Sequence, residues 1–159
     1  MNAGVRTAPV VVIGAGCIGT AIAYHLGRRG VKGVVVVERA IQSGAGSTGK
    51  CAGGIRQQFS TEVNVRLAQL SVRAFERFAE EMDTGETFWP VGYLFLLSDE
   101  AQWVAFQAQA ELQRSLGVPT RTLTAADARA MVPELDVEGV LGATFCPTDG
   151  LGDPHMITH

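Results

Sequence analysis

The sequence is poor in the features that mark several large classes of proteins. Only 18% of its 159 residues are charged and the net charge is −3, so it offers no basic surface for nucleic acid or an anionic membrane. Its three cysteines, Cys17, Cys51 and Cys146, are too few and too widely spaced for a disulfide framework or a zinc site. It also has no apolar run long enough to span a membrane. We therefore expect a reducing, cytoplasmic setting.

What the sequence does have is the composition of a packed globular protein. Hydrophobic residues make up 47% of the chain, which is enough to form a core at this length. Two short runs rich in valine, 10–13 and 34–37, stand near the N-terminus. Between them lie three glycines at the spacing G-x-G-x-x-G, namely Gly14, Gly16 and Gly19, followed by apolar residues at helical spacing. This pattern predicts a strand–turn–helix–strand unit.

The glycines and the acid that ends the second strand fit a dinucleotide site. Gly14 allows the tight turn, Gly16 leaves room for a diphosphate beside the backbone, and Gly19 lets the helix pack on the sheet. The N-terminus of the helix offers unpaired N–H groups and a partial positive charge. Glu38 can accept hydrogen bonds from both ribose hydroxyls and would repel a 2′-phosphate. The sequence therefore predicts a dinucleotide site that does not take NADP.

A glycine-rich segment, 39–54, follows this unit directly. Glycine and hydroxyl residues at this density form no regular element by themselves. The segment could be a flexible linker, but we favour a binding loop, because Lys50 and Arg56 lie at its edge and because it follows a nucleotide-binding strand. Its small residues and backbone N–H groups could lie against a flat, electron-accepting ring.

The rest of the sequence predicts alternating helices and strands. Apolar periodicity and capping residues indicate helices at 61–82, 100–116 and 125–131, and strands at 93–97, 118–123 and 140–145. The stretch 146–154 is rich in turn residues. It ends in Asp153 and Pro154, a capping acid followed by proline, which indicates the start of another helix.

The sequence stops soon after this helix start, and only two central strands of a parallel sheet are evident. We therefore expect the chain to be the N-terminal portion of a longer protein. The strands 93–97 and 140–145 would then lack later neighbours and leave open apolar edges. We expect the isolated chain to fold poorly or to be inactive.

Four segments beyond the nucleotide motif carry a family resemblance. They are SGAGSTGKCAGGIRQQFS (43–60), GYLFLL (92–97), LGVPTRTLT (116–124) and PTDGLGDP (147–154). With them the chain resembles the N-terminal part of FAD-dependent amino-acid oxidoreductases of the D-amino-acid oxidase superfamily, especially the group of the sarcosine oxidase β-subunit and the dye-linked L-proline dehydrogenase β-subunit. The resemblance implies an α/β fold: a Rossmann-like FAD-binding βαβ unit within 1–82, part of an α+β substrate domain in 83–146, and in 147–159 the start of a return helix to the FAD domain.

The resemblance also implies a chemistry. FAD would be the cofactor, and the reaction would oxidise the C–N bond of a sarcosine-, glycine- or proline-like amino acid or secondary amine by hydride transfer to the flavin. Oxygen or a dye- or quinone-type carrier would accept the electrons, and partner subunits are possible. Arg56 would be the catalytic residue, holding the substrate carboxylate or the flavin, although an ordinary salt bridge is an equally good interpretation of it. The contacts to FAD would come from Gly14, Gly16, Cys17, Ile18, Gly19, Glu38, Arg39, Ser47, Thr48, Lys50, Cys51, Gly53, Gly54 and Ile55.

The sequence departs from some of these relatives in one place. Several of them attach the flavin covalently through a histidine in the segment that corresponds to 47–51, and this sequence has no histidine there. We therefore expect any flavin to be bound non-covalently. Cys51 is the only candidate nucleophile in that segment, and a small packing role fits it better. Two other functions remain open: an NAD-binding dehydrogenase domain, and a nucleotide-binding product without catalytic activity.

Overall fold

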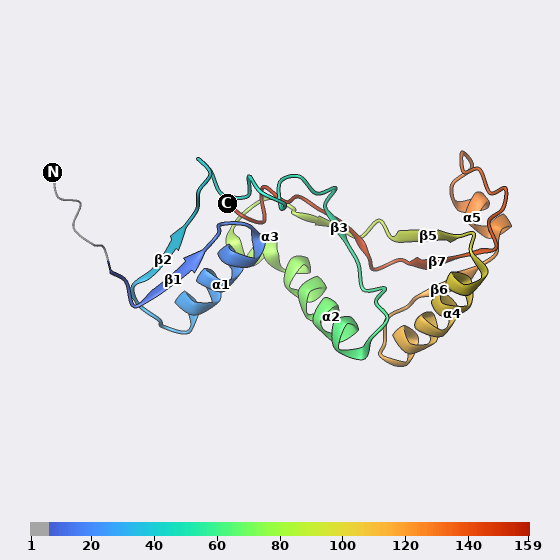
Figure 1. Cartoon of the computed structure of the whole chain (residues 1–159), viewed down its shortest axis with the longest axis horizontal. Coiled ribbons are helices and arrows are strands. Elements are labelled where there is room, and N and C mark those ends of the chain that lie inside the picture. The colour runs from blue at the N-terminus through green and yellow to red at the C-terminus, as the bar shows by residue number, and fades with distance from the viewer. Residues whose placement is uncertain (1–6) are drawn as a thin grey trace. The chain divides into compact units, whose positions relative to one another are not determined.

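The computed structural model describes residues 7–159 (Figure 1). These residues form two compact units. The first unit consists of the chain up to Gly53 together with Asp153–His159, and the second is Gly54–Gly152. The sequence placed its boundaries after residues 82 and 146 instead, because it assigned the helix that follows the glycine-rich segment to the first unit. Which parts of the chain make up the FAD-binding and substrate domains stays a prediction.

The first unit is the expected βαβ unit. Strands β1 (Val10–Ile13) and β2 (Val34–Val37) pair in parallel, in a register that sets Val10 beside Val34 and Ile13 beside Val37. Helix α1 (Cys17–Arg28) connects them and packs on both strands. A parallel pair needs such a crossover, because the chain must return to the same end of the sheet. The prediction of this unit from glycine spacing and valine runs is confirmed.

The larger sheet of the second unit has three antiparallel strands in the order β5-β7-β6. Strand β7 (Gly142–Cys146) lies between β5 (Tyr93–Leu97) and β6 (Arg121–Leu123). The expectation that both 93–97 and 140–145 leave open apolar edges was therefore wrong for β7, which is paired on both edges. Its second partner, β6, is shorter than the predicted strand 118–123, because 118–120 forms a turn after the preceding helix.

A second, smaller sheet was missed by the sequence analysis. It has the order β3-β8-β4 and consists of Gly54–Ile55, Gly150–Gly152 and Phe88–Trp89, all antiparallel. The stretch around β8 was predicted only as turns. A Cβ atom at Gly150 would lie 2.0 Å from the carbonyl oxygen of Trp89, so this glycine allows two backbones to meet rather than ending an element.

Two helices of the second unit, α4 and α5, begin where capping residues predicted. Helix α4 (Glu100–Ser115) starts after Asp99, whose side chain accepts a hydrogen bond from Gln102 N. Helix α5 (Ala125–Met131) starts after Thr124, which forms a capping box with Asp127. Both caps satisfy N–H groups that the helix itself leaves unpaired.

Two helix predictions need correction. The single helix expected over 61–82 is divided into α2 (Glu62–Glu76) and α3 (Phe78–Met82), with a break at Arg77. Asp153 does cap a turn, because its Oδ1 accepts hydrogen bonds from His155 N at 2.8 Å and Met156 N at 3.0 Å. The residues after it form hydrogen-bonded turns rather than a helix.

The core of the second unit is formed around Val65, Val118 and Cys146, against which Phe59 and Leu116 pack. Val65 lies on the inward face of α2, and its side chain is fully buried. Burial raises the pKa of the Cys146 thiol, which therefore stays protonated and acts here as a small apolar side chain. Within residues 7–159, no helix is both long enough and apolar enough to cross a membrane.

This core gives a direct test of the fold through two valines of one helix. Val65 has an exposed fraction of 0%, whereas Val63 has 62%. We expect Val65→Ala to lower the free energy of unfolding by about 2 kcal/mol, because the substitution leaves a cavity. Val63→Ala should change it by less than about 0.5 kcal/mol, as exposed substitutions do. Urea denaturation followed by circular dichroism measures both. Equal effects of the two substitutions would contradict this packing of α2.

Candidate functional site

The turn between β1 and α1 has the geometry that its glycines predicted. Gly14 has a φ of +99°, a conformation that side chains with a Cβ atom rarely adopt. A Cβ atom at Gly19 would lie 1.8 Å from the carbonyl oxygen of Gly14, so only glycine lets α1 approach the turn this closely. Gly14 N also donates to Val37 O at 2.8 Å, which continues the pairing of the two strands into the turn.

The structure adds a partner to the turn that the sequence analysis did not find. The hydroxyl oxygen of Thr48 accepts a hydrogen bond from Cys17 N, the first N–H group of α1, at 3.1 Å. A Cβ atom at Gly16 would lie 2.9 Å from the same oxygen, so Gly16 makes room for Thr48. Of the predicted site residues, Gly16, Cys17 and Thr48 are thus brought together at the N-terminus of α1.

The N-terminus of α1 keeps two donors for a ligand. Thr20 N donates to Gly16 O, while Ile18 N and Gly19 N have no acceptor among the described residues. Helix N-termini bind anions through such unpaired N–H groups and through the helix dipole. The arrangement can therefore hold a phosphate group beside Thr48.

Glu38 connects the end of β2 to this turn. Its Oε2 atom accepts a hydrogen bond from Ala15 N at 2.8 Å, and its Oε1 atom accepts one from Ala40 N at 2.9 Å. These two backbone donors, of which that of Ala15 has the larger effect, hold the pKa of the Glu38 carboxyl below its usual range. The carboxyl is therefore ionised at neutral pH. A carboxylate has about four lone-pair sites, which leaves acceptors free for hydroxyl groups of a ligand.

Residues 39–53 of the glycine-rich segment belong to the same unit and are hydrogen-bonded to its turn. Gly44 N donates to Ala15 O at 2.8 Å, and Gly49 N donates to Gly44 O at 2.7 Å. The thiol of Cys51 donates to Thr48 O at 2.9 Å. These bonds favour an ordered loop over a flexible linker. The predicted positions Ser47, Lys50 and Cys51 are exposed within this loop, Arg39 is exposed at its start, and the buried Gly53 ends the first unit.

The sequence analysis also missed a contact between this loop and the turn at 153–159. The terminal turn lies against it, because Ser43 Oγ lies 3.0 Å from His159 Nδ1. Thr158 approaches Gly44 so closely that a Cβ atom there would lie 2.8 Å from its hydroxyl oxygen. No local sequence signal could find these pairs, because the partners are more than a hundred residues apart.

Arg56 belongs to the second unit and is stacked between aromatic rings. Its guanidinium carbon lies 5.0 Å from the ring centre of Phe59 and 5.3 Å from that of Phe95. The side chain is exposed, and no carboxylate among residues 7–159 forms an ion pair with it. The salt bridge considered for Arg56 is therefore not formed within the described part of the chain. An arginine stacked in this way presents the edge of a planar fork to a ligand. Gly54 and Ile55, which precede it, form strand β3.

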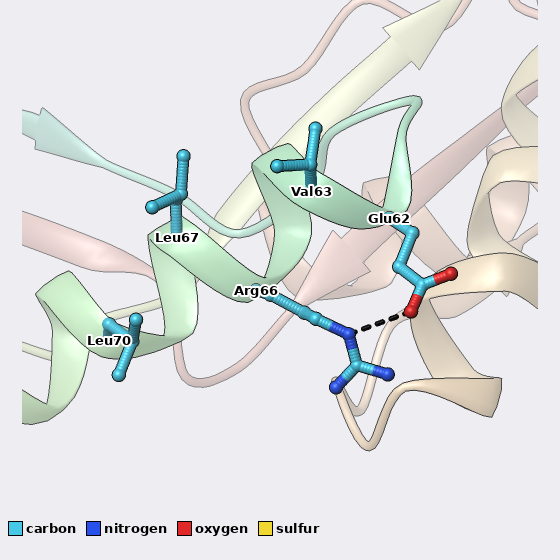
Figure 2. A pocket seen from close by; sticks show the side chains of 5 residues that line it. All are labelled: Glu62, Val63, Arg66, Leu67 and Leu70. Atoms are coloured by element: carbon cyan, nitrogen blue, oxygen red, sulfur yellow. Dashed lines mark hydrogen bonds and ion pairs between the residues drawn. The ribbon is translucent and has the colours of Figure 1, made fainter.

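An open hollow of about 380 Å³ also lies in the second unit, on one face of α2 (Figure 2). It is lined by Glu62, Val63, Arg66, Leu67 and Leu70. Arg66 Nε donates to Glu62 Oε1 at 2.7 Å across one turn of the helix. None of the predicted site residues lines this hollow.

Comparison with solved structures supports the fold. L-proline dehydrogenase from P. horikoshii is similar over 96% of this chain, with 41% identity and a TM-score of 0.85, and the match covers 40% of that chain. Glycine oxidase from Geobacillus kaustophilus is similar over 95% of this chain, with 26% identity and a TM-score of 0.80, and the match covers 42% of that chain.

Comparison of sequences agrees. Mitochondrial sarcosine dehydrogenase from Homo sapiens is 32% identical over 149 residues, which are 93% of this chain and 16% of the relative. The chain thus spans well under half the length of the proteins it matches. The family model described as DAO, FAD dependent oxidoreductase, matches residues 9–159. With nearly its whole length matched, the chain belongs to the DAO family of FAD-dependent oxidoreductases.

Proposed function

We propose that the first unit binds the ADP part of FAD, with the diphosphate at the N-terminus of α1 and the ribose at Glu38. FAD is the cofactor of the family. The observation that carries the proposal is the ionised carboxylate of Glu38, held by Ala15 N in the same turn whose helix offers the unpaired N–H groups of Ile18 and Gly19. The residues present therefore fit both the diphosphate and the ribose.

The ring-facing part of the site would come from the loop and the residues after it. Thr48, already bound to the helix N-terminus, would approach the diphosphate with Cys17. We assign the flavin ring to the remaining residues that the family resemblance indicated, which are Arg39, Ser47, Lys50, Cys51, Gly53, Gly54 and Ile55. Lys50 is exposed and adds positive charge beside the site, which suits an electron-rich reduced ring.

The proposed reaction is oxidation of the C–N bond of a small amino acid or secondary amine. When bound, FAD supplies the two-electron acceptor for this oxidation, and the imine product is hydrolysed by water. The relatives are named for sarcosine, L-proline and glycine, which all join an amine to a carboxylate on one carbon atom. Arg56 has no carboxylate partner among residues 7–159 and would bind that shared carboxylate.

The electron acceptor, the partners and the compartment are also proposals. Both a dehydrogenase and an oxidase are among the relatives, so either a dye- or quinone-type carrier or oxygen would take the electrons, and partner subunits could relay them. We propose the cytoplasm, because the three cysteines are unpaired. The turns that follow Glu38, in place of a helix, support FAD over an NAD-binding domain.

The assignment of Glu38 can be tested with two nucleotides that differ by one phosphate. We expect the chain to bind 5′-ADP more tightly than adenosine 2′,5′-bisphosphate, because the carboxylate repels the 2′-phosphate. Glu38→Gln should weaken 5′-ADP binding by about tenfold and narrow the difference between the two nucleotides. Isothermal titration calorimetry measures the affinities of both nucleotides for the wild type and the variant. An unchanged preference for 5′-ADP in the variant would exclude Glu38 from the ribose site.

The role of Arg56 can be tested in the FAD-loaded protein with pyrrole-2-carboxylate, an unreactive analogue of a cyclic amino acid. We expect Arg56→Lys to weaken its binding by about tenfold or more, because lysine lacks the bidentate fork. Flavin absorbance during titration reports the binding. Arg121→Lys is the matched control, since Arg121 is likewise stacked, over Phe145 at 5.0 Å. Equal losses in the two variants would argue against a special role for Arg56.

The mode of flavin attachment gives a further prediction. Segment 47–51 contains no histidine, and the thiol of Cys51 is already hydrogen-bonded to Thr48 O. We expect trichloroacetic acid to precipitate a colourless protein and to leave FAD in the supernatant. The absorbance of both fractions measures the partition. Colour that stays in the pellet of wild-type protein but not of Cys51→Ser would identify a covalent bond to Cys51.

A further inference from the structure

The segment that carries Arg56 is held by a buried acid from a distant part of the chain. The side chain of Asp149 has an exposed fraction of 0%. Its Oδ1 atom accepts hydrogen bonds from Gln57 N at 2.8 Å and from Gln57 Nε2 at 3.3 Å, and its Oδ2 atom accepts one from Gln58 Nε2 at 3.1 Å. Both oxygens thus bind the two residues that directly follow Arg56.

Gln58 links Asp149 to the strand that carries Phe95, one of the two rings that stack on Arg56. Its Nε2 atom also donates to Tyr93 O at 3.0 Å, and its Oε1 atom accepts from Thr144 Oγ1 at 2.8 Å. Tyr93 belongs to strand β5, which also carries Phe95. The bridge from Asp149 through Gln58 therefore fixes the backbone beside Arg56 relative to the strand of Phe95.

Phe59, the other ring that stacks on Arg56, is held through its backbone groups. Phe59 N donates to Gln57 O at 2.8 Å, which closes a tight turn, and Phe59 O accepts from Gln113 Nε2 at 3.0 Å. Gln113 belongs to α4 and is 2% exposed. The three residues after Arg56 are thus held at both ends by buried side chains, while Arg56 itself stays exposed.

A buried carboxylate is a costly way to fill a core. Desolvation raises the pKa of Asp149, which means that the folded state disfavours its charged form. Apolar side chains in place of Asp149 and its partners would carry a smaller desolvation penalty than this carboxylate does. The carboxylate of Asp149, unlike an apolar side chain, provides two directional hydrogen-bond acceptors. These define one conformation of the bound segment, Gln57 and Gln58.

We propose that Asp149 is a positioning residue for Arg56, because it fixes the backbone at Gln57 and Gln58 so that the guanidinium lies over Phe59 and Phe95. This proposal rests on the proposed function of Arg56 as the group that binds the substrate carboxylate. Without Asp149, Arg56 keeps its charge but loses its fixed orientation, so ordering it becomes part of the cost of binding.

The test uses the side-chain Nε–Hε signal of Arg56 in a ¹H–¹⁵N spectrum of the whole chain. The Arg56→Lys variant identifies the signal by its disappearance. In the wild type we expect the Hε proton to be displaced by the ring currents of Phe59 and Phe95. In Asp149→Asn it should move toward the position of an unstacked arginine, while the signal of Arg121 over Phe145 stays in place. An Arg56 signal that does not move in folded Asp149→Asn overturns the proposal.

Two further variants keep the test decisive. If Asp149→Asn does not fold, Gln58→Met removes the donor to Asp149 Oδ2 and the link to Tyr93 while preserving side-chain length, and the same displacement is expected. Thr120→Val is the control for a buried substitution. Thr120 is 1% exposed, and its hydroxyl has no partner within the described residues. A signal of Arg56 that moves as far in Thr120→Val as in the other variants would show only a general loss of packing, and would overturn the proposal.

Titration with pyrrole-2-carboxylate separates this proposal from the function on which it rests. If the wild type binds the analogue, Asp149→Asn should bind it about five- to tenfold more weakly. If the wild type does not bind it, the proposed role of Arg56 fails, yet the displacement of the Arg56 signal still decides whether Asp149 positions the side chain. Equal affinities of wild type and folded Asp149→Asn would contradict the positioning role.

Discussion

The hydrogen bond from Ala15 N to Glu38 is the interaction on which the proposed nucleotide site depends. It joins the turn after β1 to the residue that ends β2, over a distance of 2.8 Å. The bond follows from the parallel pairing of β1 with β2, which continues into the turn where Gly14 N donates to Val37 O at 2.8 Å. Gly19, which has no side chain, lets α1 approach the same turn closely. In the proposed site, Glu38 would bind the ribose and the N-terminus of α1 would bind the diphosphate.

The second unit uses a carboxylate in a comparable way, but in a buried position. Glu38 is exposed and its pKa is lowered by backbone donors, so it can still accept hydrogen bonds from a ligand. Asp149 is buried and its pKa is raised by desolvation, and its oxygens are occupied by the segment next to Arg56. Glu38 is thus suited to accept hydrogen bonds from a ligand, whereas Asp149 holds the two residues that follow Arg56.

The chain belongs to the DAO family and covers part of the length of its relatives. The chain matches 40% of the length of the L-proline dehydrogenase and 16% of that of the human sarcosine dehydrogenase. Within that span lie the βαβ unit that we propose for the ADP part of FAD and an arginine stacked between two rings. The hollow on α2 takes no part in either feature and exposes Leu67 and Leu70 beside the Arg66–Glu62 pair (Figure 2).

The sequence by itself determined the features that depend on neighbours along the chain. The βαβ unit follows from glycine spacing and valine runs, and the starts of α4 and α5 follow from Asp99 and Thr124, because a cap and its helix lie within one turn. Only the tertiary structure decided that 150–152 forms a strand and that Asp149 binds Gln57, 92 residues earlier. The physical reason is that strand pairing and buried hydrogen bonds are satisfied by partners distant in sequence. A polar residue in a turn-rich stretch does not reveal which buried donors it will meet.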